Sequence, residues 1–171
     1  MPMHFTPGEY AARQQMARAA LQAAGFDAIL MFAPESHYWI SGYDTFGFAM
    51  FQCMVLTARG DLHLLTRTPD LRQAQLTSTL SDAEIHIWQE AEGAEPALDL
   101  ARLLRDLEVT GPVGYESDTA GLTDRNGRAL HRALPGLIDA SDLIRALRRV
   151  KSPAQIAMHR HAIEHDPPQA A

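Results

Sequence analysis

The spacing of hydrophobic and polar positions changes several times along the chain, and each change predicts a different element. The segment 27–33 continues after Asp27 as an apolar run without alternation, which is typical of a strand buried on both faces of a sheet. At 84–88, polar and apolar residues alternate, which is typical of a half-buried strand. At 97–109, leucines and alanines recur at helical spacing and predict a helix with one apolar face.

The segment that precedes the first strand predicts a helix over 6–24. Thr6 is a suitable N-cap, a proline follows at the first helical position, and a glutamate stands at the third position, so the segment begins with a capping box. Gly25 is suited to end the helix in a left-handed conformation. An apolar stripe is expected to face the core, with Arg13 and Arg18 outside it. Its members are Met16, Ala17, Ala20, Leu21 and Ala24.

The rest of the pattern predicts alternating strands and helices. Further strands are expected at 50–57, 62–67, 113–116 and 137–139, and further helices at 69–79, 121–134, 141–147 and 154–163, with a short one beginning at Pro34. The turn Arg59-Gly60-Asp61 joins 50–57 to 62–67 as an antiparallel hairpin. This order predicts an α/β fold with a mixed β-sheet of about six strands flanked by helices.

Composition excludes several classes of function. The formal net charge of −6 argues against nucleic-acid binding, which needs a basic face. Cys53 is the only cysteine, so neither an intramolecular disulfide nor a cysteine-based zinc site is possible, and we expect an inert core thiol in a reducing, cytoplasmic compartment. No signal-peptide pattern occurs at the N-terminus, and the longest apolar run falls far short of the ~20 residues of a membrane helix.

One stretch, 34–56, combines aromatic residues, glycines and a carboxylate, and it is the strongest candidate for a functional loop. Asp44 could act as a functional carboxylate, although a turn residue or helix cap is the simpler interpretation. Phe46 and Phe48 could line a pocket or an interface, as could Tyr38 and Trp39, and core packing is expected to account for at least half of these four.

Other candidates carry weaker signals. Glu116 and Asp118 follow a predicted strand, where a ligand site is possible and a solvated loop is the simpler interpretation. His161 and His165 are four residues apart and could share one helix face as weak metal-ligand candidates, but the tail beyond them favours no metal site. No phosphate-binding glycine motif is present, and no complete catalytic constellation can be assembled.

Three segments together resemble a known family. They are the opening GEYAARQQMARAALQAAGFDAILMFAPESHYWISGY, the VGYES that follows the third long helix, and DLIRALRRVKSPAQI near the end. Over about 5–162 the chain resembles the N-terminal domain of the creatinase/prolidase family, which includes Xaa-Pro dipeptidases and aminopeptidase P. The resemblance implies an N-terminal domain at 1–150, followed by a truncated linker helix and tail at 151–171.

The resemblance implies a non-catalytic domain that caps the substrate site and supports dimerisation. In the family, a C-terminal pita-bread domain holds two divalent metals through Asp, Asp, His, Glu and Glu; that half would begin after Ala162 and is missing. We therefore expect no catalytic residue, no cofactor in this chain and no activity of the chain alone. The expected partner is a second copy of the chain or a pita-bread catalytic domain, with no nucleic acid and no membrane.

Some relatives contact the substrate of the partner subunit through the loop after Ser-Gly-aromatic. By that likeness Tyr43, Asp44, Phe46 and Phe48 are the candidates for substrate contact, with Asp44 directed at a substrate amine. Creatinase carries a Phe-x-Arg pair in this loop. Here Phe48 matches the phenylalanine and Met50 occupies the arginine position, so a dipeptide or another small amide fits better than creatine.

Two alternatives to an accessory domain remain open. The chain could be a stand-alone homodimer that binds a small amide or amino-acid derivative, or it could associate with a separately encoded catalytic chain.

Overall fold

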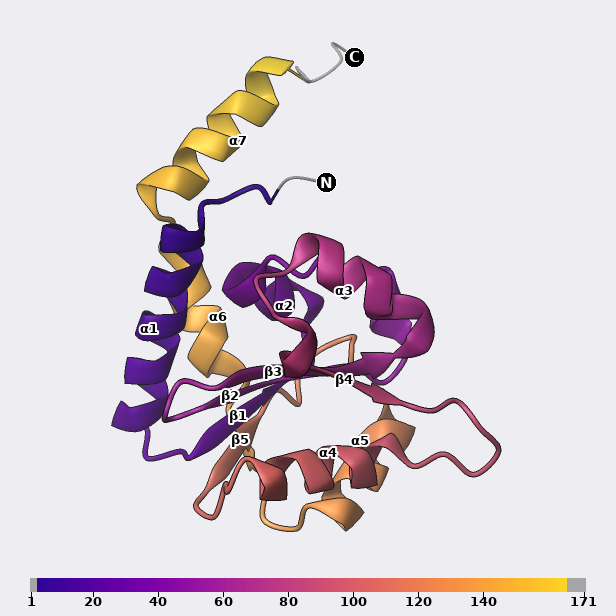
Figure 1. Ribbon diagram of the computed structural model, residues 1–171. Coiled ribbons are helices and arrows are strands. Elements are labelled where there is room, and N and C mark those ends of the chain that lie inside the picture. The colour runs from indigo at the N-terminus through magenta and orange to yellow at the C-terminus, as the bar shows by residue number, and fades with distance from the viewer. Residues whose placement is uncertain (1–2, 166–171) are drawn as a thin grey trace.

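Six strands form one mixed sheet in the order β4-β3-β2-β1-β5-β6 (Figure 1). The computed structural model describes residues 3–165, without the side chain of His165. The strands are β1 (Ala28–Met31), β2 (Cys53–Thr57), β3 (Leu62–Arg67), β4 (Ile85–Trp88), β5 (Val113–Tyr115) and β6 (Ile138–Asp139). β2 pairs antiparallel with β1 and with β3, as the predicted hairpin requires, whereas β1–β5, β5–β6 and β3–β4 are parallel pairs.

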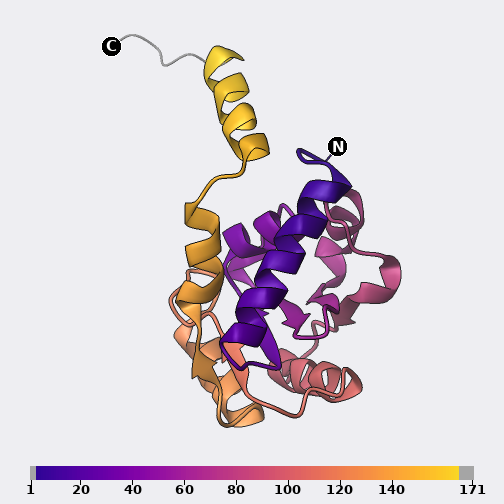
Figure 2. The ribbon, with the colours of Figure 1, turned by 90° about the vertical axis from the view of Figure 1, so that its left-hand side faces the viewer.

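Helices cover both faces of the sheet, and the predicted α/β class with a mixed six-stranded sheet is confirmed. On one face lie α1 (Pro7–Ala23), α2 (Pro34–Ser41), α3 (Leu71–Thr77) and α6 (Ser141–Arg149); on the other lie α4 (Pro96–Asp106) and α5 (Asp124–Ala133) (Figure 1). Short 3-10 turns occupy Gly47–Ala49, Thr68–Asp70 and Asp82–Glu84. α7 (Pro153–His165) extends away from the sheet and its covering helices (Figures 1 and 2).

The core consists of two apolar layers, one on each side of the sheet. Ile29 of β1 packs in the first layer with side chains of α1, α2, α3 and α6, whereas Leu30 packs in the second layer with side chains of α4 and α5. Each layer contains one tryptophan, Trp39 in the first and Trp88 in the second. All residues of β1 are buried, which confirms the prediction of a strand with two buried faces.

The predicted apolar stripe of α1 is confirmed at Ala17 and Leu21, which are fully buried, but it is wrong at other positions. Arg13 is only 1% exposed, whereas Met16 is 47% exposed, so α1 is rotated relative to the prediction. Arg13 donates to the Trp39 carbonyl at 3.1 Å and to Glu9 Oε1 from two nitrogens, at 3.1 and 3.0 Å, and its guanidinium lies 4.1 Å from the ring centroid of Phe5. These contacts satisfy a charge that would otherwise be costly to bury.

The segment between α6 and α7 is held by α1. Ser152 accepts a hydrogen bond from the backbone N–H of Gln155 at 3.2 Å, which confirms it as the expected cap of the last helix, and its hydroxyl donates to Glu9 Oε1 at 2.6 Å. α6 ends at Arg149 and α7 begins at Pro153, close to the predicted boundary at 150/151. That division into two parts stays a prediction. Among the described residues, no helix is both long and apolar enough to cross a membrane.

Candidate functional site

The connections after β1 and β5 leave the sheet on opposite faces. β1 continues into α2 on one face, and the loop after β5 leads to α5 on the other face (Figure 1). Adjacent parallel strands with connections of this kind leave a crevice beyond their carboxyl ends. Here a cleft of about 770 Å³ lies at that position, and we call it the β1–β5 cleft. Its lining comes from residues 33–35, Phe48, residues 116–120, Ser141, Arg145 and Arg148.

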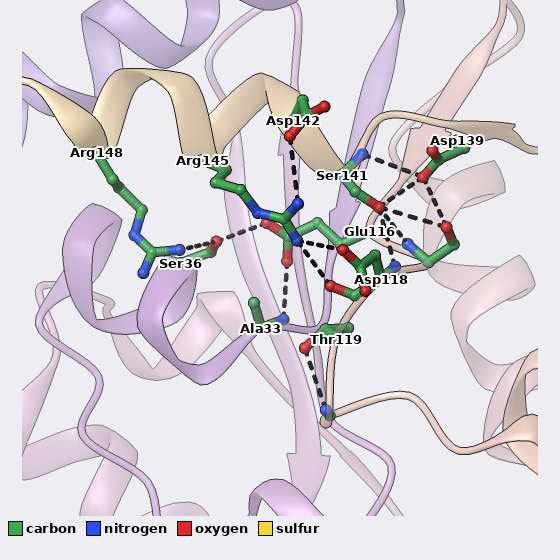
Figure 3. Close-up of polar contacts among 12 residues, drawn as sticks. Ala33, Ser36, Glu116, Asp118, Thr119, Asp139, Ser141, Asp142, Arg145 and Arg148 are labelled. Atoms are coloured by element: carbon green, nitrogen blue, oxygen red, sulfur yellow. Dashed lines mark hydrogen bonds and ion pairs between the residues drawn. The ribbon is translucent and has the colours of Figure 1, made fainter.

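A buried glutamate forms part of the lining of the β1–β5 cleft. Glu116 is 3% exposed, and its carboxylate accepts a hydrogen bond from the backbone N–H of Phe32 at 2.9 Å. It also accepts from the backbone N–H of Ala33 at 2.8 Å and from the Ser36 hydroxyl at 2.6 Å (Figure 3). Burial raises the pKa of Glu116, and these hydrogen bonds and Arg148 oppose that rise. The interpretation of Glu116 as a solvated loop residue is therefore wrong, because the side chain turns inward to the start of α2.

A hydrogen-bond network fixes another wall of the cleft. Asp139 Oδ1 accepts from the hydroxyls of Ser117 at 2.7 Å and Ser141 at 2.6 Å, and these bonds lower the pKa of Asp139 (Figure 3). The Ser141 oxygen in turn accepts from the backbone N–H groups of Ser117 at 2.9 Å and Asp118 at 3.0 Å. The loop after β5 is thus fixed to the start of α6. Ser141 makes these contacts as the first residue of α6, whose N-cap is Ala140.

Two arginines of α6 line the cleft, and only one of them forms ion pairs with carboxylates of described residues. Arg145 donates to the Asp118 carboxylate at 3.0 Å and also contacts Asp142 at 3.3 Å. Arg148 donates to the Ser36 hydroxyl at 3.4 Å, and in the described part of the chain it forms no ion pair with a carboxylate (Figure 3). No sequence pattern distinguishes Arg148 from its neighbours in the basic end of this helix, which is why it was not among the predicted site residues.

The loop predicted to contact substrate follows α2. Gly42 ends the helix at φ +83°, a left-handed conformation that favours glycine. Tyr43 follows with a fully buried side chain, which stacks on His37 at a ring distance of 6.1 Å. Burial raises its pKa. Tyr43 therefore belongs to the core, whereas the other three candidates, Asp44, Phe46 and Phe48, are exposed.

The base of the Asp44–Met50 loop is fixed while its tip is exposed. Thr45 donates to Gln52 Oε1 at 3.0 Å and accepts from the Gly47 backbone at 2.9 Å. A Cβ on Gly47 would overlap Gln52 Nε2 and the Asp70 carboxylate, so only glycine fits without movement. The apolar side chains of this loop point outward, with exposures of 88% for Phe46, 44% for Phe48 and 38% for Met50.

Two of the predicted contact residues border different hollows. Phe48 lines the β1–β5 cleft, whereas Asp44 lines a neighbouring hollow of about 360 Å³ between α2 and the start of α7. Phe46 lines neither of these hollows. The structure thus brings Asp44 and Phe48 to two sides of α2 and leaves Phe46 at the tip.

The pair of weak metal candidates lies partly outside the described residues and stays a prediction. His161 lies on exposed α7, and the side chain of His165 is outside the described residues. Among the described residues, no group of three or more histidine, cysteine, aspartate or glutamate side chains could hold a metal ion. The described residues therefore do not fit the pair of divalent metals that the resemblance associates with a catalytic domain.

The sequence pattern of the creatinase/prolidase N-terminal domain matches residues 13–150. The chain belongs to this family. The match includes β1, α2, the Asp44–Met50 loop and the loop after β5, so all candidate residues around the β1–β5 cleft are part of the creatinase/prolidase N-terminal domain.

Curated relatives of this creatinase/prolidase N-terminal domain are longer proteins. An uncharacterized hydrolase/peptidase, y4tM of Sinorhizobium fredii, is 29% identical over 168 residues, which cover 94% of this chain and 43% of the relative. The ectoine hydrolase of Halomonas elongata is 27% identical over 166 residues, which cover 92% of this chain and 42% of the relative. The chain thus spans less than half the length of these relatives.

A solved structure supports the same fold. The dipeptidase PepE of Mycobacterium ulcerans superposes with a TM-score of 0.73 at 22% identity, over 90% of this chain and 40% of that chain. At this identity the likeness shows the fold alone. The chain corresponds to the N-terminal part of peptidase and hydrolase family members.

Proposed function

We propose that this domain is the non-catalytic, substrate-capping and dimerisation domain of a peptidase-type or amidohydrolase-type metalloenzyme, and that it is inactive alone. The observation that carries the proposal is the match of residues 13–150 to this family, together with two curated relatives that are more than twice as long as this chain. The chemistry of the reaction would belong to another domain, and any metal would be held there.

The geometry of the Asp44–Met50 loop supports a capping role. Its base is fixed by Thr45 and by the close approach of Gly47 to Gln52, and its tip exposes Phe46 and Met50. Exposed aromatic and apolar side chains on a fixed support are typical of a surface that contacts another surface. A second subunit or a catalytic domain is the partner proposed for this tip.

The substrate class that fits best is a dipeptide or another small amide. Asp44 is exposed, and its carboxylate forms no ion pair with a cationic side chain in the described part of the chain. It is therefore available to a substrate amine. At the position where creatinase would place a carboxylate-binding arginine, Met50 offers no hydrogen-bond donor. The names of the relatives, a dipeptidase and a hydrolase/peptidase, agree with this class.

The proposal predicts that the purified chain does not hydrolyse Xaa-Pro dipeptides in the presence of Mn²⁺ or Co²⁺. The physical reason is that its described residues offer no cluster of ligands for a catalytic metal pair. A full-length dipeptidase relative, assayed in the same buffer, is the positive control. Metal-dependent turnover by the chain, at a rate that scales with its concentration, would overturn the proposal.

A further inference from the structure

The β1–β5 cleft and the neighbouring hollow adjoin at the start of α2, and the two together are called the groove. Both are lined by Pro34, Glu35 and Arg148, so these residues stand where the two spaces meet. The larger space, about 770 Å³, lies within the range of roughly 300–1,000 Å³ that is typical of small-molecule sites. It also occupies the crevice at which open α/β sheets commonly bind ligands.

The groove contains two cations that form no ion pair with a described carboxylate: Arg148, which lines both hollows, and Lys151, which lines the smaller one and donates to the Arg148 backbone carbonyl. Arg145 is held by Asp118 and Asp142, whereas the only side-chain hydrogen bond of Arg148 in the described structure is the 3.4 Å contact to Ser36. A guanidinium has five N–H donors in a planar fork, which suits a carboxylate bound through two parallel hydrogen bonds. Arg148 therefore keeps most of its donors for a ligand.

The same groove contains carboxylates without a cation partner. Glu35 lines both hollows and Asp44 lines the smaller one; both are exposed, and neither forms an ion pair with a described residue. A simple anion at Arg148 would meet these negative charges and the buried Glu116 nearby. A ligand that carries both a negative and a positive group matches the lining better.

We propose that this groove binds a small zwitterion of the size of an amino acid or dipeptide. Arg148 holds its carboxylate, and Glu35 and Asp44 attract its ammonium group. The cleft walls are suited to such a ligand because Ser117, Ser141 and Asp139 already fix one another and need no rearrangement. The site lies within one chain, so it requires no second domain and goes beyond the capping role of the loop.

Calorimetric titration with three matched probes tests the pairing of charges. Glycylglycine carries both charges, N-acetylglycylglycine carries only the carboxylate, and glycylglycinamide carries only the ammonium. Glycylglycine is expected to bind about tenfold more tightly than either analogue, because each analogue loses one charge-assisted interaction. Equal affinity of the three probes, or no heat from any of them at millimolar concentration, would overturn the proposal.

Two neighbouring arginines provide a matched pair of variants. Arg148→Met is expected to weaken glycylglycine binding by about tenfold, whereas Arg149→Met, on the same helix but outside both hollows, leaves it unchanged. Arg148→Lys keeps the charge without the planar fork and is expected to fall between them. Equal affinities of the Arg148→Met and Arg149→Met proteins would contradict the assignment.

Amide NMR of the unmodified chain locates the ligand even if Arg148→Met does not fold. Glycylglycine is expected to shift the signals of Ser117 and Thr119, which line the cleft, and to leave those of Arg102 on α4 unchanged. Shifts confined to residues outside the groove would place the ligand elsewhere and overturn the proposal. Binding of glycylglycine and hydrolysis of dipeptides are independent measurements. Binding by the chain would support the groove, and the absence of hydrolysis would separately support the proposed function.

Discussion

The Asp44–Met50 loop and the β1–β5 cleft flank the same short helix, α2, but present opposite chemistry. The loop has a fixed polar base and an exposed apolar tip, which ends in Phe46. The cleft is lined by polar groups, and Glu116, Asp139 and Ser141 are already hydrogen-bonded within the chain. Both depend on α2, because the loop follows its end and Glu116 holds its start.

The loop tip is a surface that is stabilised by a partner protein, whereas the cleft is a pocket that can bind a small ligand without one. An exposed apolar tip gains stabilisation only when another surface covers it, because water contact with its rings is unfavourable. A polar cleft with fixed walls can bind a small ligand with little reorganisation. Substitutions on each side of α2 should therefore have effects of different size and kind.

The largest effect on folding is expected from Glu116→Ala. It removes the acceptor of two buried backbone N–H groups and of the Ser36 hydroxyl, so we expect a loss of roughly 3–5 kcal/mol in the free energy of unfolding. Glu35→Ala is the matched control, an exposed carboxylate in the same cleft, and should change stability by less than about 1 kcal/mol. Urea unfolding measures both, and similar losses would show that α2 does not depend on Glu116.

A smaller effect is expected from pH at His37, the buried histidine of α2. Burial lowers its pKa from 6.5 to about 4, against the opposing hydrogen bond to the Met31 carbonyl at 2.8 Å. Because the folded chain resists protonation that the unfolded chain accepts, His37 reduces stability as the pH falls from 6.5 towards 4. The loss is at most about 3 kcal/mol and is absent above pH 6.5.

His37→Gln isolates this contribution because it does not titrate and keeps a hydrogen-bond donor. The difference in unfolding free energy between the wild type and His37→Gln should change in favour of the variant as the pH falls from 7 to 4. The comparison with a variant is needed because Glu116, whose pKa is raised, favours the folded state at low pH and so has the opposite sign. Parallel pH profiles would contradict the prediction for His37.

The smallest effect on folding is expected at the loop tip. Phe46→Ser should change the free energy of unfolding by less than about 0.5 kcal/mol, because the side chain is 88% exposed. The same change should weaken self-association, measured by light scattering across a dilution series. Leu98→Ser, at an exposed leucine on α4 across the sheet, is the control. An unchanged association constant for Phe46→Ser would remove the tip from the dimer interface.

Local sequence patterns were sufficient to predict the fold class, because the strand and turn signals come from residues that are neighbours in the sequence. The unbroken apolar run at β1 and the turn at Gly60 predicted a doubly buried strand and a hairpin, and both are present. The strand predicted at 50–57 begins later, at Cys53, with Met50 exposed next to the loop. The apolar character of Met50 could not distinguish a strand position from an exposed loop position.

The site depended on contacts that no local pattern contains. Glu116 became a buried acceptor because β1 and β5 place it beside Phe32 and Ser36, about 80 residues away in the chain. Arg13 became a core residue because the carbonyl of Trp39 lies within its reach. Their charge and their position in the periodic pattern predict that Glu116 and Arg13 lie at the surface. Only the tertiary structure shows that both are buried.

The separate location of the two tryptophans gives the domain an internal optical probe for each side of its sheet. Trp39 reports on the layer that includes α2, and Trp88 reports on the layer beneath α4, where its indole nitrogen donates to the Phe51 carbonyl at 3.0 Å. Single-tryptophan variants would therefore resolve by fluorescence whether the two layers melt in one cooperative step or in succession.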